Sequence, residues 1–305
     1  MNRGTSWTLQ MENTIIDMLN LNISIPEIAI VMGRTVHSIT SRINIINKKK
    51  VDSNGITESS TVSSETLHIG QPIQSPKINK QINFNSIIEK IRGKKVIILD
   101  LETTGLINDR TKFFEYWNNT VYDSCRIVEI GYWYTPCFDP NIQQLNINNY
   151  IRKPTDFFDI PQGAVDVHGI SYEKAINEGF LFNKIMLNNK DDNGTICLSL
   201  YQILNTIDVF ISHNTAFDFY VLLNELYRMK HFKTIQHLKN IRTNKNVICT
   251  CKHTGYKRLG NIYKSLFNCD VKVAHRAGDD VKTLIEIIIN KQFDDSTNFI
   301  QKINN

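Results

Sequence analysis

From about residue 84 onward, short apolar runs alternate along the chain with apolar residues spaced as in an amphipathic helix. The run VIILDLETTG (residues 96–105) predicts a buried strand, and RIVEIGYWYT (126–135) and NINNYIRKP (146–154) predict two strands beside it. Further strands are expected at 208–212 and 246–251, and helices at 173–187, 196–206, 257–267 and 277–289. Strands that alternate with helices predict an α/β domain, here residues 84–305.

The first 50 residues differ, because their apolar residues recur at helical spacing in three short segments. Thr35 is placed to cap the third segment. The stretch WTLQMENTIIDML…SIPEIAIVMGRTVHSITSRI resembles the homeodomain-like and Myb-like helix-turn-helix units. This resemblance implies that the last helix enters the major groove of DNA. The expected phosphate contacts are Arg34, Arg42, Lys48, Lys49 and Lys50. A helical protein-docking module with a solvated basic end is the alternative.

Residues 51–83 are rich in Ser, Thr, Asn, Gln and Ile and have no sustained periodicity, which predicts a disordered linker. We therefore expect three parts: a DNA-binding module at 1–50, a linker at 51–83 and the α/β domain at 84–305. A flexible linker would make the first module a tether that raises the local concentration of nucleic acid near the second domain.

Composition narrows the function classes. The formal charge of the 305 residues is +5, and residues 1–50 hold six Lys or Arg against three acids, so the positive excess lies at the N-terminus. The six cysteines lack the paired spacing of a zinc ribbon or finger. The sequence shows neither a signal-peptide pattern nor an apolar run of about 18 residues, which predicts an intracellular, soluble protein with reduced thiols and no membrane partner.

Acidic residues supply the candidate chemistry. Asp100 and Glu102 are two residues apart on a strand, so their side chains share a face. Two acids this close need protons or a multivalent cation, and ligands that are all oxygen favour magnesium or manganese over zinc. Asp218 lies one turn into a helix, on the face expected to pack on the sheet. Farther on, helical periodicity turns Asp280 inward and its neighbour Asp279 outward.

His275 lies five residues before Asp280, which is a rotation of about 140° on a helix. The two side chains converge only if His275 lies in the loop that enters the helix. A lone histidine is more often structural, but one beside four inward acids is a candidate proton acceptor.

Three motifs, DLETTG (100–105), HNTAFDF (213–219) and HRAGDD (275–280), occur in this order. They resemble the exonuclease motifs of the DEDDh family, the proofreading-subunit-like 3′-to-5′ exonucleases of the ribonuclease H-like superfamily, over about residues 94–292. The resemblance implies a ribonuclease H-like mixed five-stranded sheet flanked by helices. The sequence departs from the family in a longer segment between Leu106 and Arg126. This difference leaves undetermined how the substrate would run near the pocket that holds the terminal nucleotide in the family.

The same resemblance assigns roles to residues. It implies two divalent cations, Mg²⁺ or Mn²⁺, held by Asp100, Glu102, Asp218 and Asp280, and it makes His275 the general base. It implies nucleotide contacts by Thr103, Thr104, Leu106, His168, His213, Asn214 and Phe217.

Three functions compete at this point. The first is a metal-dependent 3′-to-5′ DNA exonuclease, tethered to duplex by the N-terminal module. The second is an RNA exonuclease, because the same motifs serve both sugars. The third is a DNA-binding regulator that uses the nuclease fold as a scaffold, and the complete set of acids argues against it. The sequence does not identify a polymerase or repair partner.

Overall fold

The structure, a computed structural model, describes Trp7, Glu12, Ile15, Ile16 and Leu19 and residues 25–31, 34–51, 84–107, 114–155, 158–190, 196–272, 275–293 and 298–300. The chain forms two compact units, Met1–Ile82 and Asn83–Asn305. Residues 52–83 of the expected linker lie outside the described residues, so the linker stays a prediction.

Helices form the described part of the first unit. Glu12, Ile15, Ile16 and Leu19 are helical, and α2 (Ile25–Val31) and α3 (Val36–Val51) follow. The core of the unit consists of buried apolar side chains, namely Ile15, Ile28, Ala29, Ile39 and Ile46. Thr35 caps α3 as predicted, because its Oγ1 accepts a hydrogen bond from the backbone N–H of Ser38 at 3.1 Å.

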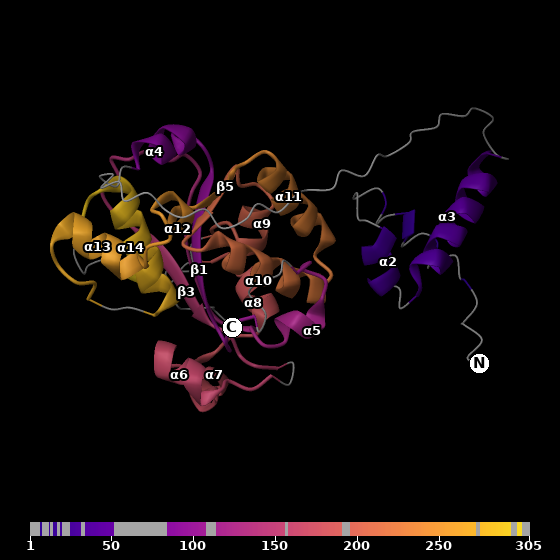
Figure 1. The fold of residues 1–305 in the computed structure, drawn as a ribbon, viewed down its shortest axis with the longest axis horizontal. Coiled ribbons are helices and arrows are strands. Elements are labelled where there is room, and N and C mark those ends of the chain that lie inside the picture. The colour runs from indigo at the N-terminus through magenta and orange to yellow at the C-terminus, as the bar shows by residue number, and fades with distance from the viewer. Residues whose placement is uncertain are drawn as a thin grey trace. The chain divides into compact units, whose positions relative to one another are not determined.

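A mixed sheet forms the centre of the second unit (Figure 1). Its strands are β1 (Val96–Thr103), β2 (Ile127–Thr135), β3 (Asn146–Ile151), β4 (Val209–Ser212), β5 (Val247–Cys249) and β6 (Asn298–Ile300), in the order β5-β4-β1-β2-β3-β6. The pairs β1–β2 and β2–β3 are antiparallel, and β1–β4, β4–β5 and β3–β6 are parallel. The first five strands in this order form the predicted ribonuclease H-like sheet, and the short β6 adds an edge strand beside β3.

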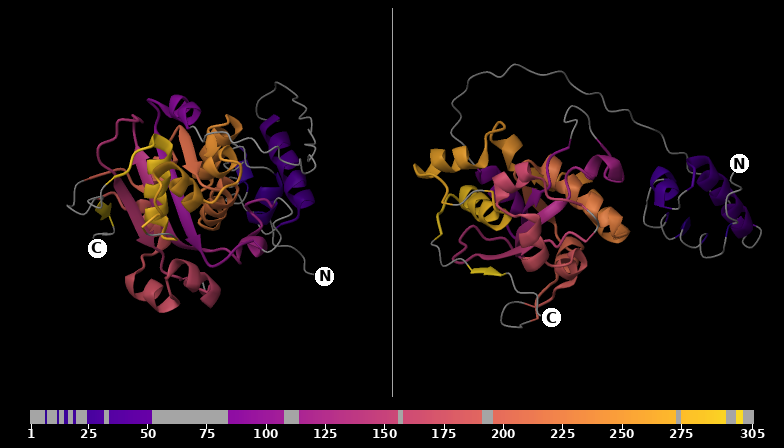
Figure 2. Two further views of the ribbon diagram at one scale, coloured as in Figure 1. Left: turned by 60° about the vertical axis from the view of Figure 1, so that its left-hand side comes forward. Right: turned by 90° about the horizontal axis from the view of Figure 1, so that it is seen from below.

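Helices cover both sides of this sheet (Figures 1 and 2). The helices α13 (Leu259–Phe267) and α14 (Ala277–Ile289) lie on one side, and α9 (Leu200–Leu204), α10 (Thr215–Arg228) and α11 (Phe232–Thr243) lie on the other. The remaining helices are α4 (Asn85–Ile91), α5 (Asn119–Tyr122), α6 (Gln162–His168), α7 (Tyr172–Glu178), α8 (Phe182–Leu187) and α12 (Thr250–His253).

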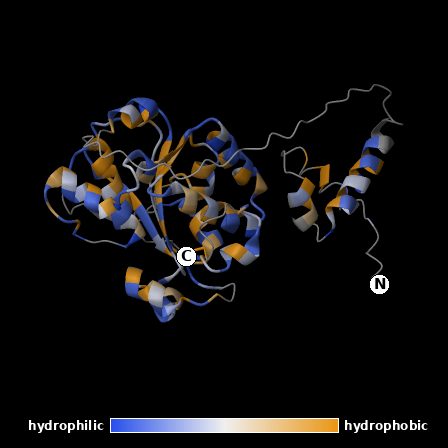
Figure 3. Ribbon diagram, in the orientation of Figure 1, coloured by the Kyte–Doolittle hydropathy of each residue, from blue (hydrophilic) through white to orange (hydrophobic). Residues whose placement is uncertain are grey.

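The core lies between the sheet and its helices. The central strands are mostly hydrophobic, whereas the helices combine hydrophobic and hydrophilic positions (Figure 3). Every residue from Val96 to Leu99 is fully buried, because both faces of β1 are covered. A strand of this kind holds the acids at its end in a fixed position.

Several predicted helix bounds were wrong. The helix expected over 173–187 is two helices, α7 and α8, because Phe180 leaves the helix to bond with β3: its N–H donates to the carbonyl of Ile151 at 2.9 Å. The helix expected over 196–206 is only α9, which begins where Ser199 and Gln202 form a capping box. The helix expected over 257–267 begins only at Leu259, the first residue of α13.

None of the helices in the described part of the chain combines the length and the hydrophobicity that a membrane-spanning segment needs.

Candidate active site

The end of β1 carries the first two acids. Asp100 lies opposite Gly131 of β2, and Glu102 lies opposite Glu129. The alternation along the strand puts both acids on one face. Glu102 is 9% exposed, and Asp100 is half-buried. These carboxylates are therefore presented by a rigid element at the edge of the core.

The other two acids come from helices on either side of the sheet. Asp218, in the first turn of α10, is 3% exposed. Asp280, in the first turn of α14, is half-buried. Its neighbour Asp279 is also half-buried, but only Asp280 belongs to a group of potential metal ligands.

The four acids perturb one another. Burial raises the pKa of Asp100 well above its ordinary range, and the charges of Asp218, Asp280 and Glu102 raise it further. Burial and then the charge of Asp280 raise the pKa of Glu102 to about 8. The pKa of Asp218 rises to about 8 and that of Asp280 to about 7, in both cases first through burial. Such carboxylates stay ionised at neutral pH only beside a compensating cation.

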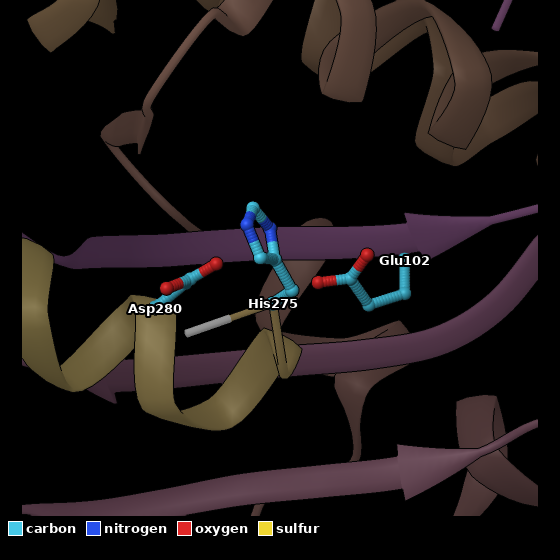
Figure 4. Close-up of side chains that lie close together, drawn as sticks. All are labelled: Glu102, His275 and Asp280. Carbon is cyan, nitrogen blue, oxygen red and sulfur yellow. The ribbon is translucent and has the colours of Figure 1, made fainter. Parts of the chain in front are cut away.

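His275 completes this group. It is exposed, lies in the loop just before α14, and has a left-handed backbone with φ 60°. One ligand atom each from Glu102, His275 and Asp280 lie within 4.8 Å of one another, and Figure 4 shows the three side chains gathered beside β1 and the start of α14. The carboxylates supply the oxygen ligands that Mg²⁺ or Mn²⁺ prefers, and the imidazole of His275 lies beside them. The structure thus brings Glu102, His275 and Asp280 together, and the charges of Asp100 and Asp218 act on the same group.

The turn after β1 is held by its own hydrogen bonds. The hydroxyl of Thr103 donates to the carbonyl of Gly105 at 2.6 Å. The hydroxyl of Thr104 donates to the carbonyl of Ser124 at 3.2 Å and accepts from the N–H of Arg126 at 2.9 Å. Leu106 is 47% exposed. The two hydroxyls therefore fix the turn, and Leu106 is the predicted contact whose side chain projects from it.

The predicted contacts His168 and His213 are engaged inside the protein. His168 is buried, and its Nδ1 accepts from the N–H of Ile170 at 3.1 Å. The Nδ1 of His213 lies 3.0 Å from Oγ1 of Thr250, and its Nε2 lies 3.0 Å from the carbonyl oxygen of Lys257. His213 thus joins segments of the fold, whereas the hydrogen bond of His168 is local and its buried Nε2 has no hydrogen-bond partner among the described residues.

Asn214 and Phe217 lie at the start of α10. Asn214 is the N-cap residue of this helix, but its backbone is left-handed (φ 72°) and its side chain makes no cap hydrogen bond. It is exposed, whereas Phe217 is half-buried. Asn214 is therefore the more accessible of these two predicted contacts.

A buried acid near the site was missed from the sequence. Glu129 is 0% exposed, and its carboxylate accepts hydrogen bonds from Arg276, Ala277 and Asn149. The available signal was an acid inside the apolar run RIVEIG, which indicates a buried charge in need of partners. The pattern did not reveal which residues those partners are.

The predicted DNA contacts in the first unit have internal partners where the structure describes them. The guanidinium groups of Arg34 and Arg42 lie over the ring of Trp7, at 4.7 and 5.4 Å from its centroid. Arg42 also forms an ion pair with Glu12. The side chains of Lys48, Lys49 and Lys50 lie outside the described residues. The two arginines thus contribute to the packing of this unit.

Solved structures with a similar fold include several nucleases. Cell-death related nuclease 4 (CRN-4) is 18% identical with a TM-score of 0.38, and the match covers 65% of this chain and 63% of that one. E. coli exonuclease I with a dA16 oligonucleotide is 15% identical with a TM-score of 0.44, and the match covers 65% and 41%. The nuclease domain of 3'hExo, a DEDDh family member bound to rAMP, is 13% identical with a TM-score of 0.42, and the match covers 65% and 91%.

A comparison with curated protein sequences gave no match. A family model described as exonuclease, in contrast, matches residues 97–288, which span β1 to α14 and include all five residues of the acid and histidine group. The chain therefore belongs to the exonuclease family.

Proposed function

We propose that this chain is a metal-dependent 3′-to-5′ exonuclease that removes nucleotides from DNA. One observation carries the proposal: four mutually repelling carboxylates from three elements converge beside an exposed histidine. These acids, Asp100, Glu102, Asp218 and Asp280, would hold two Mg²⁺ or Mn²⁺ ions. When bound, such ions stabilise the negative charge that develops on the phosphate and on the leaving oxygen.

The residues of the chain supply the remaining steps. His275 accepts a proton from the attacking water at a ring nitrogen, and its exposure leaves that nitrogen open to solvent. The internally bonded hydroxyls of Thr103 and Thr104 hold the turn that orients the terminal nucleotide, and Leu106 presents an apolar side chain to its base. Phosphodiester cleavage at a chain end needs both a fixed terminal nucleotide of the substrate and a correctly positioned general base, here His275.

An RNA substrate is the alternative, since a protein distinguishes the sugars by contacts to the 2′-hydroxyl. The hydroxyls of Thr103 and Thr104 already have partners in the chain, so no described contact favours a ribose. The regulator hypothesis is disfavoured because a scaffold has no need for four repelling acids, which destabilise the fold unless a bound cation compensates their charge.

The N-terminal unit is proposed to bind duplex DNA. The outward face of α3 carries exposed His37, Thr40, Ser41 and Asn44, whose donors and acceptors suit base edges in the major groove. Because Arg34 and Arg42 pack against Trp7, phosphate contacts by this unit would rest mainly on Lys48, Lys49 and Lys50. Partners beyond nucleic acid, such as a polymerase or a repair protein, are not part of this proposal.

The test is digestion of 5′-labelled single-stranded DNA and RNA of the same sequence by the full chain with Mg²⁺ or Mn²⁺. We expect a ladder that shortens from the 3′ end on DNA, and no products with EDTA or with Asp100→Asn. A ladder on RNA alone would establish the alternative substrate. Intact strands under all conditions would refute the nuclease proposal.

A further inference from the structure

Glu129 has an unusual position for a charged residue. Its side chain is 0% exposed and lies directly across the β1–β2 ladder from Glu102. A carboxylate buried this deeply is stable only if charged or hydrogen-bonding groups surround it. Its charge reaches the candidate ligands, because it contributes to the raised pKa values of Asp100 and Glu102.

The oxygens of Glu129 are nevertheless occupied by donors from the protein. Oε1 accepts from Nδ2 of Asn149 at 2.9 Å and from Nε of Arg276 at 3.1 Å. Oε2 accepts from Nε of Arg276 at 3.0 Å and from the backbone N–H of Ala277 at 2.9 Å. With both oxygens engaged, Glu129 is not available as a fifth metal ligand, and its negative charge is compensated by Arg276.

These contacts replace a local cap on α14. The N-cap residue of this helix is Arg276, and its side chain makes no cap hydrogen bond of its own. The first N–H of the helix, that of Ala277, instead donates to Glu129, which belongs to another strand. A carboxylate at a helix N-terminus is stabilising, both as an acceptor and through the helix dipole. Through Glu129, strand β2 therefore fixes the position and the rotation of the first turn of α14 relative to the sheet.

That turn carries two of the candidate functional groups. His275 immediately precedes Arg276, in a left-handed conformation. Asp280 follows one turn later, and its N–H donates to the carbonyl of Arg276 at 2.9 Å. A displacement of Arg276 by even about 1 Å would move both groups relative to Glu102, and misplacement on this scale costs rate steeply.

We propose that Glu129 is a positioning residue, which through Arg276 and Ala277 holds His275 and Asp280 in register with Glu102. This inference rests on the proposed function, since it concerns the same site. Glu129 itself touches neither substrate nor metal. It acts as outer support for the ligands, and loss of such support commonly lowers metal affinity or activity by roughly 10- to 100-fold.

The test compares Glu129→Gln with the full wild-type chain. Calorimetric titration with Mn²⁺ measures metal affinity without reference to activity, and turnover of a short single strand gives kcat and KM separately. We expect Glu129→Gln to bind Mn²⁺ roughly 10- to 100-fold more weakly and to lose kcat by a similar factor, with KM changed little. Arg276→Lys keeps the positive charge but loses the planar guanidinium group. It should therefore lose less Mn²⁺ affinity and less kcat than Arg276→Gln.

Glu225→Gln is the matched control, because Glu225 is also a buried carboxylate bonded to arginines, Arg126 and Arg152, neither of which belongs to α14. It should lower the melting temperature while leaving Mn²⁺ affinity near the wild-type value. If Glu129→Gln behaved in the same way, with a lower melting temperature and unchanged metal affinity and kcat, the inference would be overturned. The proposed function would still stand, since it depends on the wild-type chain and on Asp100→Asn. If Glu129→Gln does not fold, the two Arg276 variants decide. Smaller losses of Mn²⁺ affinity and kcat in Arg276→Lys than in Arg276→Gln would support the inference, and equal losses would overturn it.

Discussion

Gly131 lies against Ala277, the first residue of α14, so closely that a side chain at position 131 has no room. A Cβ there would come within 2.4 Å of the carbonyl carbon of Ala277 and 2.5 Å of the N of Gly278. Because Gly131 is also the partner of Asp100 in the ladder, this close approach brings the start of α14 over the strand that carries the acids. The missing side chain thus lets the first turn of α14, which carries Asp280, approach the sheet closely.

Gly131→Ala should therefore displace α14. We expect a loss of stability of roughly 1–3 kcal/mol from overpacking, together with a large loss of hydrolysis. Gly163→Ala is the control, because a Cβ at Gly163 meets nothing within 4 Å. Urea unfolding and a turnover assay on both variants measure the two effects. Equal behaviour of the two variants would show that the approach of α14 is not tight.

His275→Ala should slow hydrolysis by roughly 10²- to 10⁴-fold and flatten the acidic limb of the pH–rate profile, because a positioned general base is removed. Since His275 has a left-handed backbone, His275→Asn tests the side chain separately, as asparagine tolerates that conformation. Mn²⁺ titration separates base from ligand. If the variants keep their Mn²⁺ affinity but have a flat acidic limb, His275 acts as the general base. If they keep the acidic limb but bind Mn²⁺ more weakly, His275 is a metal ligand instead.

The metal-free protein should lose stability as the pH rises from about 5 to about 8. The pKa values of Glu102 and Asp218 in the folded state are about 8 and that of Asp280 is about 7, all above their ordinary values near 4. In that interval the folded state holds protons that the unfolded chain has released, so stability falls with pH. Saturating Mg²⁺ should remove much of the loss at pH 8, because the cation replaces the protons.

Melting temperatures with EDTA and with Mg²⁺, at pH 5.5 and pH 8, measure this effect. Asp218→Asn should weaken the pH dependence, because it removes one of the repelling charges. A melting temperature that rises with pH in EDTA, or one that Mg²⁺ does not change at pH 8, would contradict the assignment of the acids as a cation site.

The sequence indicated the candidate metal-binding acids, but it did not indicate the residues that hold these acids in position. Helical periodicity alone selected Asp280 over Asp279, and strand alternation paired Asp100 with Glu102, because both rules depend only on local geometry. The partners of Glu129 could not be predicted in this way, since Arg276 is 147 residues away along the chain. Long-range contacts of this kind depend on the packing of α14 against β2.

The errors have the same origin. Gly179 ends α7 because Phe180 pairs with β3, and a Cβ at Gly179 would come within 2.9 Å of the backbone of Arg152 and Lys153. Arg42, whose expected phosphate contact stays a prediction, also has partners that the sequence pattern did not reveal, because the fold places it over Trp7 and beside Glu12. In both cases the tertiary contacts lie beyond what local preference can indicate.

Deletion of residues 1–50 should leave turnover on a short single strand nearly unchanged. On long duplex with a 3′ end, binding should weaken, and its salt dependence should fall by roughly 0.9 log units per log unit of salt for each DNA phosphate that the chain no longer binds. Within the full chain, Lys48→Gln, Lys49→Gln and Lys50→Gln combined should account for most of that change, and Arg42→Gln should mainly destabilise the unit. Unaltered duplex affinity together with failure to bind a protein partner would favour the docking-module alternative.

Four particular carboxylates form the catalytic cation site in the proposed mechanism, and the adjacent acids of α14 test this assignment most directly. Asp280→Asn and Asp279→Asn make the same chemical change one residue apart. Turnover of 5′-labelled single-stranded DNA in Mn²⁺, with Mn²⁺ affinity measured on the same preparations, should be abolished for Asp280→Asn and retained within a few-fold for Asp279→Asn. Retained hydrolysis in Asp280→Asn, or equal losses in both variants, would contradict the assignment.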